Sequence, residues 1–498
     1  MLADWQSIET HPRSTLSELF ENDPDRVSGF TMEQSGIYFD FSKTHLNDDL
    51  IRKFETLSCG LHVADKIKAL FAGEAINISE GRAAEHSAER GRGNEQSVEL
   101  AAMLRKRMES LVLAIESGAL GTIKHIIHLG IGGSALGPEL LLNSLAIGDE
   151  QYETVVISNI DGTALEPALE RFEADKTLLV VASKSFTTSE TLLNAQSVID
   201  WMREQGETDP YGRIVALTAA PDKAVEWGVD ESRILPFSET IGGRYSLWSS
   251  IGFSVALTLG LQSFEDLLAG AAEMDTHFAT APLDQNIPVI AAWSDQYYAQ
   301  ARQCQTRAVF AYDERLTLLP DYLQQLEMES NGKSVTSDGR ALGRHSSAIV
   351  WGGVGTDAQH AVFQLLHQGT HIVPVEFLAV IEPGHSLGPD HHHGLLLNCF
   401  GQSAALMAGQ KSDDPNRNYP GDRPSVTILL DTLDAKTLGA LIAFYEHRTF
   451  VNAALLGINP FDQFGVELGK QMANALMSGE SNEMDSSTEQ LRKRAFPA

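Results

Sequence analysis

Short β-branched runs that alternate with helical periodicity set the strongest limit on how this 498-residue chain can fold. From about residue 99 onward, buried-strand patterns recur, and segments with apolar residues at helical spacing separate them. Such alternation is typical of parallel sheets with helices on both faces. The predicted strands form two series, one at residues 123–130, 154–161, 176–183 and 213–220 and one at residues 307–313, 347–353, 371–381 and 425–431.

The segments around these two series are mostly helical in character. The connection at about residues 250–290 is apolar and contains no linker rich in proline, glycine or serine, so we expect the two α/β units to pack tightly. Residues 1–95 carry scattered helix signals, and residues 436–475 predict a long helical stretch that breaks at Gly457–Pro460. The polar residues after Ser478 predict a loose tail or a peripheral helix.

Charge and cysteine content exclude several classes of function. The chain has 37 basic and 67 acidic residues, a formal charge of -30, which disfavours nucleic acids and anionic membranes as partners. The three cysteines form neither a disulfide framework nor a CxxC metal pair, and the first residues lack a signal-peptide pattern. No apolar run approaches the ~18 residues of a membrane span. We therefore expect a cytoplasmic protein that binds any anionic substrate through a local group of donors.

Two loops after predicted strands have the composition of anion-binding sites. Residues 130–138, GIGGSALGP, place glycines where a ligand approaches the backbone at the start of a helix. Alone, this segment also fits a loose dinucleotide-binding GxGxxA pattern, with Asp161 as a ribose partner, or an ordinary tight turn. Residues 183–190, SKSFTTSE, gather hydroxyl groups and a lysine at a helix N-terminus, which suits a phosphate. The alternative is a hydroxyl-rich cap with Lys184 in solvent.

Two further segments supply a cation and a carboxylate. In residues 242–249, GGRYSLWS, paired glycines allow Arg244 to face a cleft and stabilise an oxyanion, although an exposed turn with a solvated arginine is the ordinary alternative. Residues 325–333, QLEMESNGK, predict a helix that ends at Asn331 and carries a candidate general base. A lone glutamate is more often a surface residue.

The remaining motifs contain histidines and a lysine. Thr356 and Gln359 have capping-box spacing, which predicts His360 in the first turn of a helix, where the helix dipole favours a neutral imidazole. His367 follows two turns later, so a structural histidine stripe is the alternative. If residues 461–470 are helical, Gln463 and Lys470 share one face.

A run of histidines downstream invites a metal interpretation. His391–His393, with His385 upstream, suggests zinc, but no HExxH or cysteine spacing supports a metal site. We therefore expect no metal.

Taken together, these segments resemble the glucose-6-phosphate isomerase family, in the family's order. Matches at INISEGRAAEH, PGDRPS and GALIAFYEHRTF extend the resemblance over roughly residues 70–475. It implies an α/β fold of two α/β/α sandwich domains of the sugar-isomerase type, with mainly parallel sheets and helical N- and C-terminal segments. The implied divisions are a smaller domain with the phosphate loop at residues 96–262, a larger domain at 1–95 and 263–477, and a polar tail at 478–498.

The resemblance also implies an activity and its residues. The expected reaction is the reversible isomerisation of glucose 6-phosphate to fructose 6-phosphate through ring opening and an enediolate, in glycolysis and gluconeogenesis, without a cofactor or metal. The expected assembly is a homodimer with active sites shared between subunits. The implied catalytic residues are Glu329 as the base, Arg244 beside the enediolate, and His360 and Lys470 for ring opening. The implied substrate-binding residues are Gly133, Ser134, Ser183, Lys184, Ser185, Thr188, Glu190, Gln325 and Gln463.

The residue types agree with this chemistry independently, because an aldose–ketose shift needs a base, an acid and a cation for the oxyanion. Two rival interpretations use the same segments. A nicotinamide-dependent dehydrogenase built on the GxGxxA loop leaves residues 183–190 and 325–333 without a role. A non-catalytic sugar-phosphate sensor would need no pairing of Glu329 with Arg244, and the sequence has no basic DNA-binding module.

Overall fold

The computed structural model of the protein describes residues 5–478 and 484–496. The chain separates into two compact units, Met1–Pro460 and Phe461–Ala498. The first unit holds both β-sheets, and the second holds helices α19 (Glu467–Ser478) and α20 (Ser486–Ala495). In the described residues, no helix has the length and apolar character to cross a membrane.

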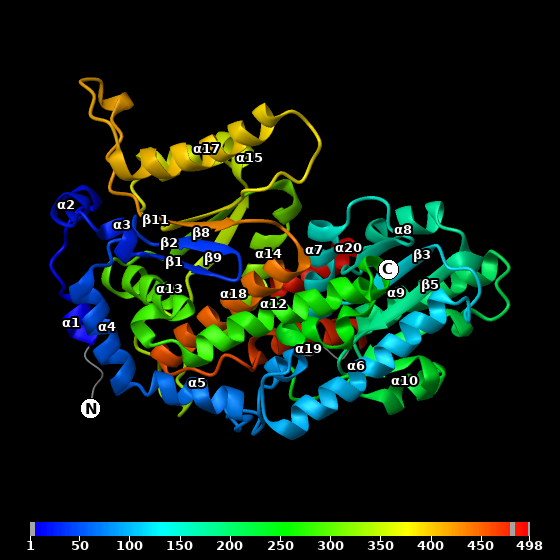
Figure 1. Ribbon diagram of the computed structural model, residues 1–498. Helices are drawn as coiled ribbons and strands as arrows, with labels where there is room; N and C mark the ends of the chain where they lie inside the picture. The colour runs from blue at the N-terminus through cyan, green and yellow to red at the C-terminus, as the bar shows by residue number, and fades with distance from the viewer. Residues whose placement is uncertain (1–4, 479–483, 497–498) are drawn as a thin grey trace. The chain divides into compact units, whose positions relative to one another are not determined.

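One sheet is parallel throughout and has the strand order β4-β3-β5-β6-β7. Its strands β3 and β5 are labelled in Figure 1. Every residue of β5 is buried, as expected of a central strand with helices on both faces. Its strands are β3 (His125–Leu129), β4 (Glu153–Ile157), β5 (Thr177–Ala182), β6 (Ile214–Thr218) and β7 (Ile234–Pro236). Its helices include α6 (Glu95–Glu116), α7 (Leu136–Leu145), α8 (Gly162–Arg171), α9 (Ser189–Glu204) and α10 (Pro221–Trp227).

The other sheet is mixed and has the strand order β1-β2-β11-β10-β8-β9. Strands β8 to β11 run parallel, while β2 pairs antiparallel with both β1 and β11. Its strands are β1 (Thr31–Gln34), β2 (Ile37–Asp40), β8 (Thr306–Tyr312), β9 (Ile349–Val354), β10 (Val375–Val380) and β11 (Ser425–Leu430). The α/β class and the mainly parallel sheets predicted from the sequence are confirmed.

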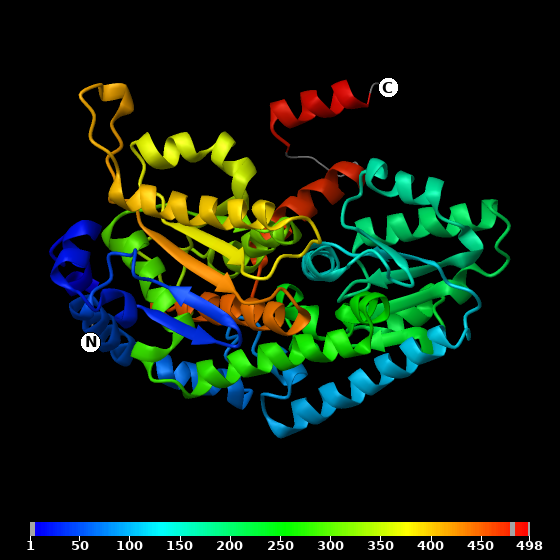
Figure 2. The same ribbon diagram turned by 45° about the horizontal axis from the view of Figure 1, so that its top comes forward.

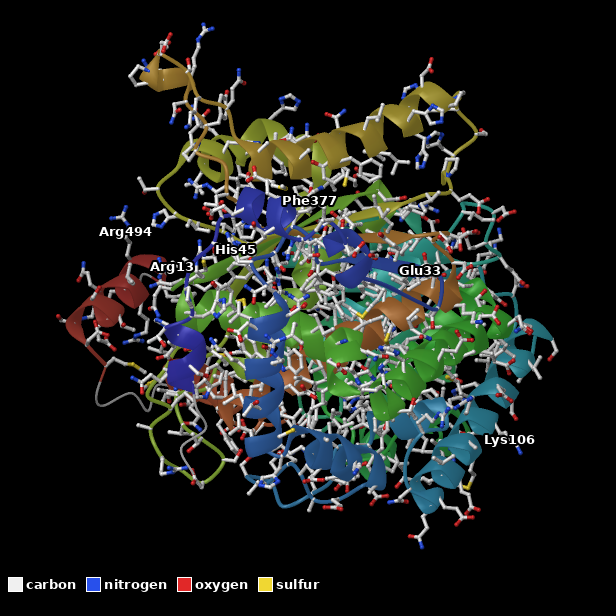
Figure 3. The ribbon with its side chains drawn as sticks, turned by 60° about the vertical axis from the view of Figure 1, so that its left-hand side comes forward. Arg13, Glu33, His45, Lys106, Phe377 and Arg494 are labelled. Atoms are coloured by element: carbon white, nitrogen blue, oxygen red, sulfur yellow. The ribbon has the colours of Figure 1, made fainter. Side chains whose placement is uncertain are left out.

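Helices cover both faces of the mixed sheet (Figure 2). Helix α17 (Pro389–Ala408) lies over the face on which Phe377 packs in an apolar cluster with Cys399 and Leu406 of that helix (Figure 3). On the opposite face, Phe444 of helix α18 (Ala435–Leu456) contacts the ring of Phe39. Lys436 is the only described residue of α18 that is not buried, so this helix forms the centre of the first unit.

Helix α12 (Leu261–Thr280) packs closely along α18 because two glycines remove side chains from the contact. A Cβ atom at Gly270 would lie 1.7 Å from the carbonyl oxygen of Lys436, and one at Gly439 would lie 2.0 Å from that of Leu267. The remaining helices of the first unit are α1 (Trp5–Glu9), α2 (Leu16–Asn22), α3 (Arg26–Gly29), α4 (Asp48–Gly60), α5 (Val63–Ala72), α11 (Phe253–Leu259), α13 (Ile287–Gln296), α14 (Leu319–Leu323), α15 (Gly355–Ala361) and α16 (Phe363–Gln368).

Most predicted elements are present, within four residues of their expected bounds. Helix α18 ends at the predicted break, where Gly457 adopts a left-handed conformation with φ of 69°. The sequence analysis missed the hairpin β1–β2 and strand β7. The hairpin turns through Ser35 and Gly36, both with positive φ, which is typical of a two-residue hairpin loop.

Two local predictions were wrong. Helix α15 begins at Gly355 with Val354 as its N-cap, so Thr356 lies inside the helix and forms no capping box. The cause is the direct passage from β9 into α15, which places His360 in the last turn rather than the first. A break at Val362 separates α15 from α16, so His360 and His367 do not form a stripe on one helix.

Gln463 and Lys470 would share a helix face only if residues 461–470 were helical, and the structure does not meet that condition. Gln463 precedes a 3-10 turn at Phe464–Val466, and helix α19 begins only at Glu467.

Candidate active site

A buried arginine lies beside a carboxylate where the 3-10 helix Gly243–Trp248 approaches the π-helix Gln324–Glu329. Arg244 is 3% exposed, and its Nη1 lies 3.5 Å from Oε2 of Glu329. Its Nε donates to Oγ of Ser330 at 2.7 Å, and its Nη2 donates to the carbonyl oxygen of Pro460. The guanidinium is therefore held in a fixed orientation, and the alternative of a solvated arginine is wrong.

One oxygen of the Glu329 carboxylate is left without a hydrogen bond among the described residues. The Glu329 side chain is 16% exposed, and Oε2 is buried but accepts no hydrogen bond from the residues that the structure describes. Glu327, two residues earlier, points to the interior and accepts from Nη2 of Arg307 at 2.5 Å. Burial raises the pKa of Glu327, and the charge of Arg307 opposes that rise. Of these two carboxylates, Glu329 is the one that lies beside Arg244.

The glycine loop after β3 lies against both the π-helix, at Gln325, and the segment that carries Arg244. Gly132 has φ of 56°, and a Cβ atom there would lie 2.7 Å from Nε2 of Gln325. A Cβ atom at Gly133 would lie 2.1 Å from the carbonyl oxygen of Gly243, next to Arg244. A side chain at Gly133 would collide with the backbone of Gly243, and one at Gly132 would have to displace the amide of Gln325 from a left-handed backbone position that favours glycine. The loop sequence therefore brings the backbone against Gln325 and the arginine segment.

A buried histidine fixes the end of the glycine loop. Nε2 of His128 lies 2.8 Å from the carbonyl oxygen of Ser134, which can only accept, so this nitrogen carries the proton. Nδ1 lies 2.7 Å from Oγ of Ser254. Burial lowers the pKa of His128 to about 4, so the ring is neutral near pH 7 and acts as a structural donor.

The second loop forms a group of hydroxyls before helix α9. Oγ of Ser183 and Oγ1 of Thr188 are 3.0 Å apart, and Ser185 pairs with Thr187 at 2.7 Å. Thr188 is the N-cap residue, yet its side chain makes no capping bond among the described residues. In the first turn, Oε2 of Glu190 accepts from Ser189 Oγ. The loop thus presents hydroxyls at a helix N-terminus, where an anion is favoured.

Lys184 in this loop is half-buried, so the alternative that placed it in solvent is wrong. Its ammonium donates to the carbonyl oxygens of Glu239 at 2.8 Å and Ile241 at 2.6 Å. Burial and the nearby charge of Arg82 lower the pKa of Lys184 to about 8.

Three predicted site residues belong to other elements of the chain. His360 is exposed at the end of α15, and nothing in residues 5–478 and 484–496 joins it to Glu329 or Arg244. Gln463 and Lys470 belong to the second unit, and both are exposed.

Sequence analysis missed two side chains that hold the arginine. Ser330 accepts from Arg244 and lies 3.0 Å from the hydroxyl of Tyr245, whose ring is within 5.5 Å of the guanidinium carbon. Burial raises the pKa of Tyr245, so it stays a neutral hydroxyl. Ser330 follows Glu329 in the sequence, and Tyr245 follows Arg244. This adjacency to predicted site residues is the only sign of their role that the sequence offers.

The histidine run has no metal-site geometry. His392 donates through Nε2 to the carbonyl oxygen of Ile381, while His391 and His393 are exposed on the first turns of α17. Within the described part of the chain, no three histidine, cysteine, aspartate or glutamate side chains gather as a metal site.

Comparison with known proteins gives close relatives over the whole length. The model of the phosphoglucose isomerase family matches residues 40–492. Glucose-6-phosphate isomerase of Rhizorhabdus wittichii is 61% identical over 494 residues, which cover 99% of both chains. That of Novosphingobium aromaticivorans is 59% identical and covers 98% of this chain and 97% of its own.

A solved structure has the same fold. The crystal structure of a glucose-6-phosphate isomerase from Chlamydia trachomatis matches with a TM-score of 0.91 and 27% identity, covering 99% of this chain and 98% of that chain. The sequence matches and this structural match cover the glycine loop, the hydroxyl loop and the Glu329 helix together. The chain therefore belongs to the phosphoglucose isomerase family.

Proposed function

We propose that this protein interconverts glucose 6-phosphate and fructose 6-phosphate, as an aldose–ketose isomerase of glycolysis and gluconeogenesis. Membership of the phosphoglucose isomerase family and relatives named glucose-6-phosphate isomerase support this reaction. The observation that carries the proposal is the pair of Glu329 and Arg244, in which an oxygen without a hydrogen bond among the described residues lies 3.5 Å from a buried guanidinium.

This pair suits proton transfer between C1 and C2 of an open-chain sugar. Glu329 removes the proton from the carbon next to the carbonyl and returns it to the neighbouring carbon, through an enediolate. The charge of Arg244 stabilises the negative oxygen of the enediolate. Because Ser330 and Pro460 already orient Arg244, little reorganisation accompanies the reaction.

The substrate phosphate is proposed to bind at the hydroxyl loop, at the N-terminus of α9. The ammonium of Lys184 has three N–H donors, of which two bond carbonyl oxygens, so the third is available to the phosphate. The resulting binding energy positions the reacting carbons far from the phosphate. The proposed phosphate ligands are Ser183, Lys184, Ser185 and Thr188, and the proposed contacts to the rest of the sugar phosphate are Gly133, Ser134, Glu190, Gln325 and Gln463.

Ring opening is proposed to use His360 and Lys470, in a site shared between the subunits of a homodimer. The exposure of His360 is compatible with a role in a partner's site. We also propose a cytoplasmic location, with which the free thiols of Cys59, Cys304 and Cys399 agree. The division into domains at residues 96–262 and at 1–95 with 263–477, followed by a tail at 478–498, stays a prediction.

The nicotinamide-dependent alternative has less support. Its basis was the GxGxxA loop, but Gly132 and Gly133 serve contacts with Gln325 and Gly243 within the protein. A dinucleotide is therefore not needed to explain these glycines.

A direct assay tests the proposed activity. Purified protein is given glucose 6-phosphate, and fructose 6-phosphate is measured through a coupled enzyme reaction, with a parallel sample that contains NAD and is monitored for absorbance or fluorescence changes. We expect product without added cofactor. Absence of product with a folded protein contradicts the proposal, and a nicotinamide signal would favour the dehydrogenase.

Removing one hydroxyl tests the proposed phosphate loop. Thr188→Ala is expected to weaken binding of a phosphorylated inhibitor by roughly ten- to a hundred-fold, because a lost hydrogen bond to a charged group costs about 1.5–3 kcal/mol. Calorimetric titration of wild type and variant measures the change. An affinity equal to that of the wild type would exclude the loop as the phosphate site.

A further inference from the structure

The segment that leads to Arg244 has little regular structure of its own. Between β7 and the 3-10 helix that carries Arg244, the chain turns at residues 237–242, where the amide of Ile241 donates to the carbonyl oxygen of Ser238. The carbonyl oxygen of Thr240 accepts from the amide of Glu85. Its conformation therefore depends on groups supplied by other parts of the chain.

Lys184 is the side chain that reaches this segment from the hydroxyl loop. Its ammonium bonds the carbonyl oxygens of Glu239 and Ile241, on either side of Thr240, at 2.8 and 2.6 Å. Arg82 also donates to the carbonyl oxygen of Glu239. One ammonium that bonds two carbonyl oxygens restrains the backbone of residues 239–241, because both hydrogen bonds are charge-assisted and share the same donor group.

The backbone of Lys184 is itself held by hydrogen bonds to residues at the end of strand β6. Its carbonyl oxygen accepts from the amide of Ala219 at 3.0 Å and from Oγ1 of Thr218 at 3.1 Å, both at the end of β6. The parallel sheet thus supports one end of the side chain, and the ammonium holds the segment that contains Ile241. Arg244 follows three residues later.

The charges around the ammonium do not explain its position. The charged groups that face it are Arg82, Glu80 and Glu239, and no carboxylate forms an ion pair with Lys184 among the described residues. Burial of the cation, together with the charge of Arg82, opposes its protonation. Bonding to two backbone carbonyl oxygens therefore points to a geometric role.

We propose that Lys184 is a positioning residue for Arg244, which links the phosphate loop to the segment that carries the arginine. This inference rests on the proposed isomerase function and deepens it. When the phosphate takes the third N–H of the ammonium, the same side chain connects phosphate binding with the placement of the guanidinium beside Glu329. Loss of Lys184 then affects the chemical step as well as substrate binding.

Steady-state kinetics of Lys184→Met tests this link. Misplacement of a catalytic group by about 1 Å can cost on the order of 10²-fold, so we expect kcat to fall by roughly 10- to 100-fold while KM rises. Thr188→Ala changes the same loop without touching residues 239–241, and its KM should rise far more than its kcat falls. Lys223→Met removes an exposed lysine from α10 and should leave both constants unchanged. Lys184→Arg keeps a cation with several donors, so its kcat should stay much closer to that of the wild type than the kcat of Lys184→Met does.

Hydrogen exchange supplies a second readout. In Lys184→Met, the amides of a peptide spanning residues 237–248 should exchange faster than in the wild type, whereas Thr188→Ala should match the wild type there. If Lys184→Met does not fold, Lys184→Gln carries both measurements.

The failures of the two proposals are distinguishable. A wild-type protein without isomerase activity refutes the proposed function. An active wild type, together with a Lys184 variant whose kcat and exchange are those of the wild type, refutes the positioning role alone.

Discussion

Replacing Glu329 with glutamine is expected to lower the isomerisation rate by about 10²–10⁴-fold while sugar-phosphate binding persists. Glutamine keeps the shape and a hydrogen-bonding oxygen but removes the base. The carboxylate oxygen that lies 3.5 Å from Arg244 is the one that we propose to carry the proton between C1 and C2. The measurement is incorporation of deuterium from solvent at C2 of glucose 6-phosphate during turnover in D₂O.

Two further variants sharpen this result. Glu329→Asp should retain a remnant of activity, limited by its shorter reach. Glu327→Gln makes the same chemical change two residues earlier, where the carboxylate pairs with buried Arg307. It should lower the free energy of unfolding by up to about 3 kcal/mol, because a buried pair loses one charge, while folded protein still exchanges the C2 proton. Exchange at the parental rate in Glu329→Gln would instead identify another base, with Glu327 or Glu190 next to be tested.

Most of the strands that the sequence analysis identified are apolar runs that lie almost wholly buried in the structure, as in β3, β5, β6, β8 and β10. Strand β5 is buried at every position, and such a run is readable without tertiary information. Strands β1 and β2 are short and partly polar, and their only strong signal is the turn at Ser35 and Gly36. They become strands because β2 pairs with β11, nearly 400 residues away in the chain. Such a partner is not encoded in local spacing.

The capping-box error has a tertiary cause as well. Thr356 and Gln359 have the right spacing, but α15 starts at Gly355, two residues earlier than a cap at Thr356 would place it. A Cβ atom at Gly355 would lie 2.4 Å from the ring of Tyr312, so the glycine allows the chain to pass close to β8 as it enters the helix. Gly355 therefore determines where β9 passes into α15, and the spacing of Thr356 and Gln359 does not set the start of the helix.

The candidate site was predictable in its residue types and not in its contacts. The motifs around Arg244 and Glu329 name a cation and a carboxylate, but only the resemblance to a family brought them together before the structure did. The partners that orient them were not predictable. Lys184 bonds the carbonyl oxygens of Glu239 and Ile241, and a carbonyl is present in every residue, so it leaves no signature in a sequence.

Mixing two inactive variants is expected to restore activity, if His360 of one subunit completes the site that contains Glu329 of the other. A His360→Ala chain keeps the base, and a Glu329→Gln chain keeps the histidine. In a symmetric dimer, each hybrid then contains one intact site and one site that lacks both groups. With random reassembly of equal amounts, about half of the dimers are hybrids, so about a quarter of the wild-type specific activity should return.

The experiment requires that subunits exchange, so the two variants carry different affinity tags and the hybrid dimers are isolated by successive purification on both. Isolated hybrids should reach about half of the wild-type activity, because one of two sites is intact. Each variant mixed with itself should stay inactive. His360 is exposed on α15, and no described contact ties it to its own chain's Glu329, which is the arrangement that a shared site requires. If verified hybrids are as inactive as their parents, each site is built within one chain, and His360 must approach Glu329 by a movement of its own subunit.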